Sequence, residues 1–188
     1  GVGSNLVINE VMNNPLNEQN GEFIELGNSS AASIELAGLF ISDGDQTDEL
    51  IAYNAGPTLL ASGQVALILD RDFAGNYEIP AGTVLLTTAD AHLGNGLAVT
   101  DPIALYEADG VSPIDTWTVP FNPGNGVSVE KVNVAVNDTV ANWQANDCAS
   151  GSSPGLANCV SYVPIPAGTT DLYISEVMSN PLDEATGE

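Results

Sequence analysis

The chain has 188 residues and carries 25 acidic residues against two basic ones, Arg71 and Lys131, which gives a formal net charge of -23. A field of this sign repels nucleic-acid phosphates and anionic lipid headgroups, so we expect no nucleic acid as a partner and no insertion into a membrane. Hydrophobic residues make up 44% of the chain without an apolar run that would span a bilayer, and a chain of this length can bury a core without a metal or cofactor.

Short runs of apolar, β-branched and aromatic residues recur about every ten residues and predict strands. Turn signals such as NNP, NGE, DGDQTD and NPGNG separate the runs, and no segment shows helical periodicity. Short strands at this spacing predict an all-β domain, an immunoglobulin-like antiparallel β-sandwich. The predicted strands cover residues 6–12, 22–27, 38–43, 49–53, 64–70, 84–87, 102–107, 114–119 and 126–132.

The two cysteines of the chain, Cys148 and Cys159, bracket the small-residue stretch ASGSSPGLAN. A chain segment of this kind closes easily, so the two Cα atoms can come within bonding distance. We predict one disulfide, which persists only in an oxidising compartment and therefore indicates an extracellular or cell-surface protein. Two free thiols in a cytosolic protein are the alternative.

Several predicted loops are rich in carboxylates. If the strands alternate in direction, the loops at residues 13–22, 43–48, 70–80 and 108–113 lie at one end of the domain. Crowded carboxylates repel one another, and Ca²⁺, with its roughly six to eight oxygen ligands, would relieve that repulsion. The sequence thus suggests a calcium site, with an ion-free, solvated acidic surface as the alternative. Its candidate ligands are Asp43, Asp45, Asp48, Asp70 and Asp72.

Residues suited to catalysis are sparse. His92 is the single histidine, and no GxSxG motif on a strand–turn–helix accompanies it, so a Ser-His-Asp triad is not expected. Trp117 and Trp143 have two interpretations, a carbohydrate-binding platform or core packing, and their setting favours the core. We therefore expect that the domain is not an enzyme.

The chain contains an internal repeat. Residues 171–188 (DLYISEVMSNPLDEATGE) match residues 5–22 (NLVINEVMNNPLNEQNGE) at eleven of eighteen positions without a gap. We expect a domain over residues 1–160, an extended linker over 161–170, and the first strand and turn of a second copy over 171–188. The chain opens at Gly1 without an initiator Met or signal sequence, as expected of a mature or excised fragment.

The repeated strand is apolar and needs a partner. Such a strand can add to a sheet edge of its own domain or of a neighbouring molecule, or occupy the first-strand position of the next copy. We therefore predict assembly between neighbouring copies of the domain. The side chains of this assembly strand are Leu172, Ile174, Val177 and Met178.

A series of short motifs over residues 6–159 resembles the lamin tail domain as it occurs in secreted proteins of bacteria and archaea. The motifs are, in order, INEVMNNP, GEFIELGN, LAGLFISDGD, TLLASGQVALILD, GVSVEKV, NW and SPGLAN. The resemblance implies an immunoglobulin-like sandwich without catalytic activity. It also implies that Glu25, Asn28, Gly38, Gly63 and Trp143 serve the fold rather than an active site.

Two functions follow from these observations. The first is a non-catalytic repeat module of a secreted or cell-surface protein, acting in spacing, adhesion or assembly. The alternative is an accessory domain of an extracellular hydrolase, such as a nuclease or phosphatase, that tethers the enzyme or contacts its substrate. Calcium is the one cofactor that the sequence suggests.

Overall fold

The computed structural model describes residues 5–74, 77–90, 92–136 and 138–160, and within them the fold is all-β. Each of the nine predicted strands is present. The additional strands β3, β6 and β12 are only two or three residues long, too short for a periodic pattern to form. The strands are β1 (Leu6–Met12), β2 (Phe23–Asn28), β3 (Ile34–Glu35), β4 (Phe40–Ser42), β5 (Thr47–Ala52), β6 (Leu59–Leu60), β7 (Val65–Leu69), β8 (Val84–Thr88), β9 (Ile103–Tyr106), β10 (Pro113–Trp117), β11 (Val129–Lys131) and β12 (Trp143–Ala145), and the 3₁₀ turns are η1 (Tyr53–Ala55) and η2 (Val140–Asn142).

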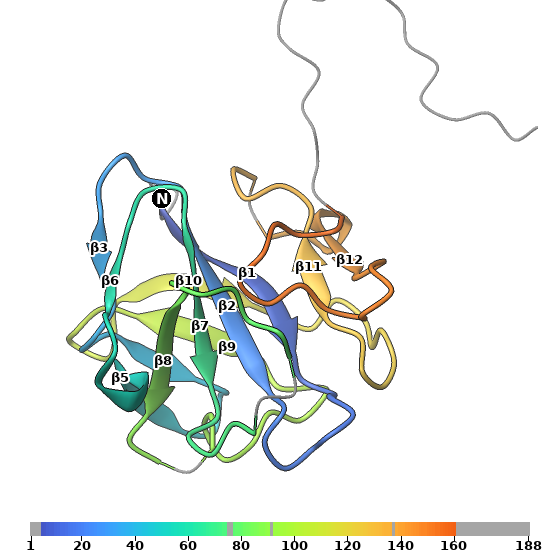
Figure 1. The fold of residues 1–188 in the computed structure, drawn as a ribbon, viewed down its shortest axis with the longest axis horizontal. Helices are drawn as coiled ribbons and strands as arrows, with labels where there is room; N and C mark the ends of the chain where they lie inside the picture. The colour runs from blue at the N-terminus through green and yellow to red at the C-terminus, as the bar shows by residue number, and fades with distance from the viewer. Residues whose placement is uncertain (1–4, 75–76, 91, 137, 161–188) are drawn as a thin grey trace, which may run out of the picture.

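Ten of these strands form one curled sheet in the order β10-β9-β4-β5-β8-β7-β2-β1-β11-β12, and β3 pairs with β6 beside it (Figure 1). The sheet is mixed, because β7 and β8 pair in parallel, with Ala66 opposite Val84. The expectation of a wholly antiparallel arrangement is therefore wrong at this pair. The long connection between Leu69 and Val84 brings the chain back to the start of its neighbour, as a parallel pair requires.

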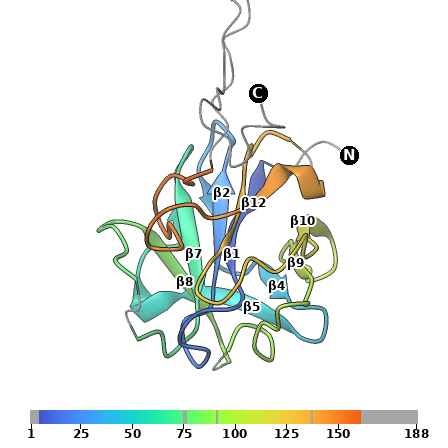
Figure 2. The same ribbon diagram turned by 90° about the vertical axis from the view of Figure 1, so that its right-hand side faces the viewer.

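The curl brings the edge strand β10 against β1 in the other half of the sheet (Figure 2). There the backbone N–H of Ile8 donates to Oδ2 of Asp115 at 2.8 Å. The two halves enclose one apolar core, in which the strands on both sides contribute fully buried side chains. These include Ile8, Val11, Ile24, Leu26, Leu50, Ile68, Leu86, Leu105 and Val129.

Trp117 and Trp143 both lie in this core. Their rings meet edge to face, with centroids 6.0 Å apart and planes at 69°. Their exposed fractions are 1% and 4%, so core packing is confirmed and neither ring forms a surface platform.

No helix in the described part of the chain is long and apolar enough to cross a membrane.

Strand β1 is buried at every position, although the polar residues Asn9 and Glu10 interrupt its apolar ones. A shift of register against β2 between Ile8 and Glu10 allows Ile8 and Val11 both to reach the core. The opposite face of the strand is covered by residues 146–160, which we call the C-terminal segment. Polar residues of β1 are thus buried beneath a second layer of chain.

Candidate functional site

Three glutamates stand side by side on the neighbouring strands β2, β1 and β11. Glu10 on β1 is opposite Glu25 on β2 and opposite Glu130 on β11. All three side chains are excluded from solvent, with an exposed fraction of 0%. Carboxylates are rarely buried to this degree unless hydrogen bonds compensate for the lost water, so these three must find donors within the protein.

Most of those donors come from the C-terminal segment. Oε1 of Glu10 accepts the backbone N–H of Ser153 at 2.9 Å and the hydroxyl of Ser128 at 2.5 Å. Oε2 of Glu25 accepts the N–H of Gly155 at 2.7 Å. A segment without strands is thereby tied to the sheet by side-chain acceptors.

Glu130 makes the largest set of these bonds. Its Oε1 accepts from the side-chain amide of Asn146 at 2.6 Å, and its Oε2 accepts the backbone N–H groups of Cys159 at 3.1 Å and Val160 at 3.2 Å. One carboxylate therefore holds both ends of the C-terminal segment against β11.

Burial shifts the titration of two of these acids. The pKa of Glu10 rises to about 7 because burial disfavours its charged form, an effect that the bonds from Ser128 and Ser153 partly offset. The pKa of Glu25 rises to about 8 through burial and then through the nearby charge of Glu10. Near neutral pH, both groups therefore retain protons that an exposed glutamate would have lost.

A disulfide joins the two ends of the same segment. Cys148 and Cys159 are bonded, with their Cα atoms 5.9 Å apart, which confirms the predicted pairing. The adjacent Asn158 donates from Nδ2 to the backbone oxygens of Lys131 at 2.8 Å and of Asn9 at 3.2 Å. Covalent and polar restraints thus fix the C-terminal segment together.

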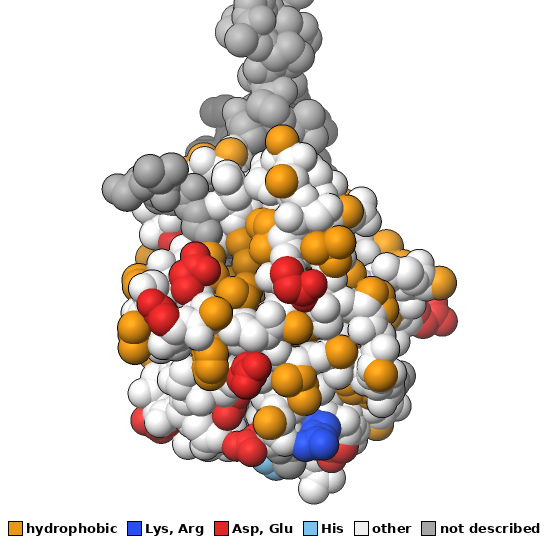
Figure 3. All heavy atoms as spheres, turned by 90° about the vertical axis from the view of Figure 1, so that its left-hand side faces the viewer, with side chains coloured by type: hydrophobic (Ala, Val, Ile, Leu, Met, Phe, Trp, Pro, Cys, Tyr) orange, Lys and Arg blue, Asp and Glu red, His pale blue; other side chains and the backbone are white. Residues whose placement is uncertain are grey.

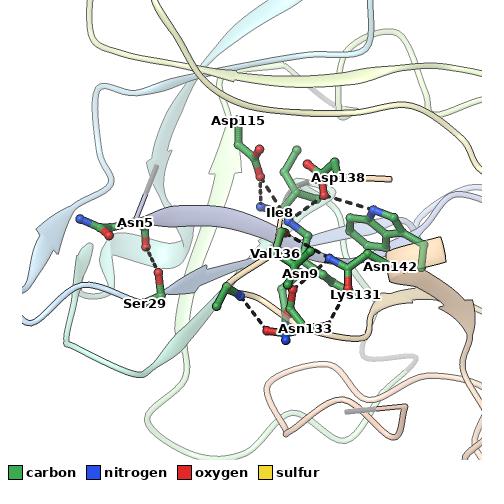
Figure 4. Close-up of polar contacts among 12 residues, drawn as sticks. Asn5, Ile8, Asn9, Ser29, Asp115, Lys131, Asn133, Val136, Asp138 and Asn142 are labelled. Carbon is green, nitrogen blue, oxygen red and sulfur yellow. Dashed lines mark hydrogen bonds and ion pairs between the residues drawn. The ribbon is translucent and has the colours of Figure 1, made fainter. Parts of the chain in front are cut away.

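A second buried polar cluster surrounds Lys131, whose side chain is only 2% exposed. Its Nζ lies 2.8 Å from Oδ1 of Asp138 and 3.9 Å from Oδ2 of Asp115 (Figure 4). Nζ also lies 5.3 Å from the ring centroid of Trp143, and the indole Nε1–H donates to the same Oδ1 of Asp138 at 3.2 Å. Burying a lysine requires such counter-charges, and this site supplies two.

Besides a hollow of about 220 Å³ beside Asn9, Lys131 and Asn158, two larger hollows adjoin these clusters. One, of about 380 Å³, lies beside the lysine cluster, and the other, of about 640 Å³, lies between the β1–β2 loop and the C-terminal segment. The smaller is lined by Asp115, Lys131 and Asp138 together with Asn5, Val7, Ser29, Ile114, Val134, Ala135 and Val136. The larger is lined mainly by Leu16, Tyr77, Pro154 and Leu156.

Three of the aspartates predicted to bind calcium, Asp43, Asp48 and Asp70, accept hydrogen bonds from the protein. Oδ1 of Asp43 accepts the N–H groups of Asp45 at 2.9 Å and Gln46 at 2.7 Å, and Oδ1 of Asp48 accepts the side chain of Gln46 at 3.1 Å. Within residues 5–74, 77–90, 92–136 and 138–160, no three His, Cys, Asp or Glu side chains are grouped so as to hold a metal ion. Calcium binding by Asp43, Asp45, Asp48, Asp70 and Asp72 stays a prediction without an assembled set of ligands.

The acidic loops meet around residues 93–97, whose backbone they bind. The N–H groups of Leu93, Asn95 and Leu97 donate to three different carboxylates, at 3.3, 2.9 and 3.0 Å. The acceptors are, in that order, Asp70, Asp43 and Glu22. Carboxylates from separate loops are thus used as acceptors for one Gly-containing turn.

The pKa shifts of these three acids differ with their surroundings. Burial raises the pKa of Glu22 to about 8 and that of Asp70 to about 6. For Asp43, burial also raises the pKa, but the backbone donors Gln46, Asn95 and Asp45 outweigh it, and the net shift is downward. His92, next to this turn, is exposed.

The predicted linker, residues 161–170, and the predicted assembly side chains Leu172, Ile174, Val177 and Met178 lie outside the described residues.

The family model of the Lamin Tail Domain matches residues 2–120, which is more than half of the chain. The chain belongs to the lamin tail domain family. No curated protein matches it. The lamin tail match ends just after β10, so β11, β12 and the C-terminal segment lie beyond it. Glu130, Lys131 and both cysteines therefore lie outside the matched part.

Residues that the lamin tail resemblance assigned to the fold have structural contacts. Asn28 donates from Nδ2 to the backbone oxygens of Ala32, Leu60 and Ala61, and accepts the N–H of Ser30. Gly38 and Gly63 have positive φ angles, which glycine adopts without strain.

Sequence reasoning missed the clusters around Glu10, Glu130 and Lys131. One signal was present, because each of these charged residues stands inside a short apolar strand, as in VINEV and SVEKV. A charge at such a position indicates a buried and partnered group. The partners come from distant parts of the chain, and no pattern in the sequence identifies them.

Proposed function

We propose that this lamin tail domain is a non-catalytic module of a secreted or cell-surface protein, and that it acts in spacing, adhesion or assembly by supplying a strand to a neighbouring copy. The observation that carries the proposal is a second version of the β1 sequence. Residues 172–178 (LYISEVM) repeat β1 (LVINEVM), and all seven residues of β1 are buried between neighbouring strands. A strand with this sequence exposes apolar side chains to water unless neighbouring strands pair with it and cover it, as they cover β1.

Two acids of the repeat correspond to buried acids of the domain and support the same proposal. Glu176 occupies the position of Glu10 in the repeat, and Glu188 occupies that of Glu22. In the domain, Glu10 binds the C-terminal segment and Glu22 binds the turn at Leu97. Retention of both acids favours a position for the repeat like that of β1 in the domain. That position lies either in a second immunoglobulin-like copy of the bacterial or archaeal secreted type or in a neighbouring molecule.

The character of the surface and of the disulfide agrees with this role. A disulfide between Cys148 and Cys159 favours an oxidising compartment, and the net charge of -23 disfavours nucleic acid as a partner. On the face shown in Figure 3, acidic side chains are scattered among uncharged and hydrophobic ones, with little basic surface. These properties suit a secreted or cell-surface module whose partners are not nucleic acids.

The test compares the mass in solution of the full chain with that of a chain ending at Thr170, by light scattering over a range of concentrations. Strand exchange predicts that the full chain associates and that the shortened chain is monomeric. Val177→Asp, at the position of the buried Val11, should also abolish association. Asp183→Asn is the matched control, because it restores the residue found at the corresponding exposed position, Asn17. A full chain that is monomeric at the highest concentration contradicts the assembly proposal.

A further inference from the structure

The cluster around Lys131 contains more groups than a simple salt bridge, because two carboxyl groups lie near one buried amine. It holds a primary amine, a carboxyl group in contact with that amine, and a second carboxyl group, that of Asp115, 3.9 Å from the same amine. The amine is almost fully excluded from water, whereas the side chains of Asp115 and Asp138 are 16% and 21% exposed toward the adjoining hollow. These are the components needed to form an amide bond within one chain.

We propose that Lys131 and Asp138 form an intramolecular isopeptide bond, with Asp115 as the acid that relays protons. This cross-link would join the end of β11 to the loop that precedes η2. The inference rests on the lysine cluster alone and is independent of the strand-exchange proposal.

The geometry places each reacting group. Nζ lies 2.8 Å from Oδ1 of Asp138, so the carboxyl carbon that bears this oxygen is at most one C–O bond farther away. Reacting atoms held in contact gain a large effective concentration, on the order of 10⁵ M or more. The indole N–H of Trp143 already donates to Oδ1, where negative charge develops when the carbonyl is attacked.

The pKa of Asp115 also suits a group that relays protons. Burial raises the pKa of Asp115 to about 6, partly opposed by the N–H of Ile8 and the charge of Lys131, while Asp138 raises it further. The Asp115–Asp138 pair therefore holds one proton more readily than two exposed aspartates would. Shielding from water also lowers the cost of converting an ammonium–carboxylate pair into a neutral amine and acid.

The reaction balances without an added reagent. The ammonium of Lys131 gives one proton to the aspartate pair, and the free amine attacks Cγ of Asp138, with the C=O electron pair moving to Oδ1. Asp115 passes its proton to the departing hydroxyl of Asp138 and takes a second proton from Nζ. The new N–C bond replaces a C–O bond, one water leaves into the hollow, and Asp115 ends protonated as it began.

The test uses the two basic residues of the chain, because trypsin cuts only after Arg71 and Lys131. After reduction and denaturation, an acylated Lys131 resists cleavage, so fragment 72–188 persists. The intact chain is then lighter than its sequence by the mass of one water. A chain of full mass that trypsin cuts completely after Lys131 overturns the proposal, whatever the variants do.

Variants separate the cross-link from other losses of water, such as succinimide formation at Asp43–Gly44 or Asp109–Gly110. Lys131→Arg keeps the positive charge but should restore the missing water and the cut after position 131. Asp138→Asn should form the same amide with loss of ammonia instead of water. Asp115→Asn should leave most chains unlinked. A loss of water that survives Lys131→Arg, or a cross-link mapped to Asp115, contradicts the assignment.

Discussion

Ser153 in the C-terminal segment binds Glu10 on β1 through its backbone N–H at 2.9 Å, and its hydroxyl reaches Glu10 at 3.2 Å and also Glu130 on β11. One residue thereby bridges two buried carboxylates on neighbouring strands. The C-terminal segment has few backbone partners on the sheet, so these side-chain bonds determine where it lies. The stability of this layer should therefore depend on the state of the glutamates.

The stability of the domain should fall as the pH rises. The carboxyl groups of Glu10, Glu22 and Glu25 have pKa values of about 7, 8 and 8 in the folded protein, against 4.5 for an exposed glutamate. Between these limits the folded state binds protons that the unfolded chain has released, so the free energy of unfolding decreases with pH. This contribution is complete below about pH 4.5 and is lost as the pH passes through about 7 to 8.

Urea unfolding at about pH 5 and about pH 8 measures this dependence. Glu25→Gln cannot ionise at this position, so its free energy of unfolding should change less between the two conditions than that of the native chain. A native chain that is more stable at the higher pH would show that these buried acids do not dominate.

Loss of the Glu130 carboxylate should release the C-terminal segment. Glu130→Ala leaves the N–H groups of Cys159 and Val160 and the amide of Asn146 without their acceptor. A buried donor left unpaired costs about 1–3 kcal/mol. We expect the free energy of unfolding to fall by about 3 kcal/mol in total. Hydrogen exchange should accelerate within residues 146–160 more than in β2 or β7. Glu35→Ala, at an exposed position, is the control and should leave exchange in the segment unchanged.

The strands could be predicted because each carries its own signal. LVINEVM is a short run rich in apolar and β-branched residues that coincides with β1, and QVALILD contains β7. The parallel pairing of β7 with β8 could not be predicted, because a residue run does not specify its neighbour. The site was missed for a related reason. Glu10 and Ser153 are separated by 143 positions, and the contact depends on how the C-terminal segment crosses the sheet.

For the loop acids, the sequence predicted the clustering of the carboxylates but not their hydrogen-bond partners. Their clustering was correctly expected for Asp43, Asp70 and Glu22, which meet at one turn. Charge counting alone could not show that the backbone N–H groups of one turn donate to these carboxylates. These contacts depend on the path of residues 93–97, which a count of charges does not specify.

Reduction of the disulfide should weaken the domain moderately. Cys148 and Cys159 are separated by 11 positions. Closing a loop of this size stabilises the folded state by roughly 3 kcal/mol in the chain-entropy description. The glutamate bonds still hold the segment, so we expect a lower Tm but a folded core. Thermal unfolding with and without reductant measures the effect, and the Cys148→Ser, Cys159→Ser double variant should be insensitive to reductant.

Gly151 should tolerate a side chain less well than another glycine of similar conformation. Gly151 and Gly38 have φ angles of +76° and +84°, a region that costs other residues about 1–2 kcal/mol. A Cβ at Gly38 would meet nothing within 4 Å, whereas a Cβ at Gly151 would overlap the backbone oxygen of Gly126. Gly151 also accepts the N–H of Ser128 at 2.9 Å, next to the serine side chain that binds Glu10.

Gly38→Ala should therefore lower the free energy of unfolding by the conformational cost alone, about 1–2 kcal/mol. Gly151→Ala should cost about 3 kcal/mol or more, because the backbone must also move and disturb the Ser128–Glu10 contact. Urea unfolding of both variants under the same conditions measures the difference. Equal losses would show that the C-terminal segment shifts freely away from β11, and that the contacts of the buried glutamates do not hold it in one position.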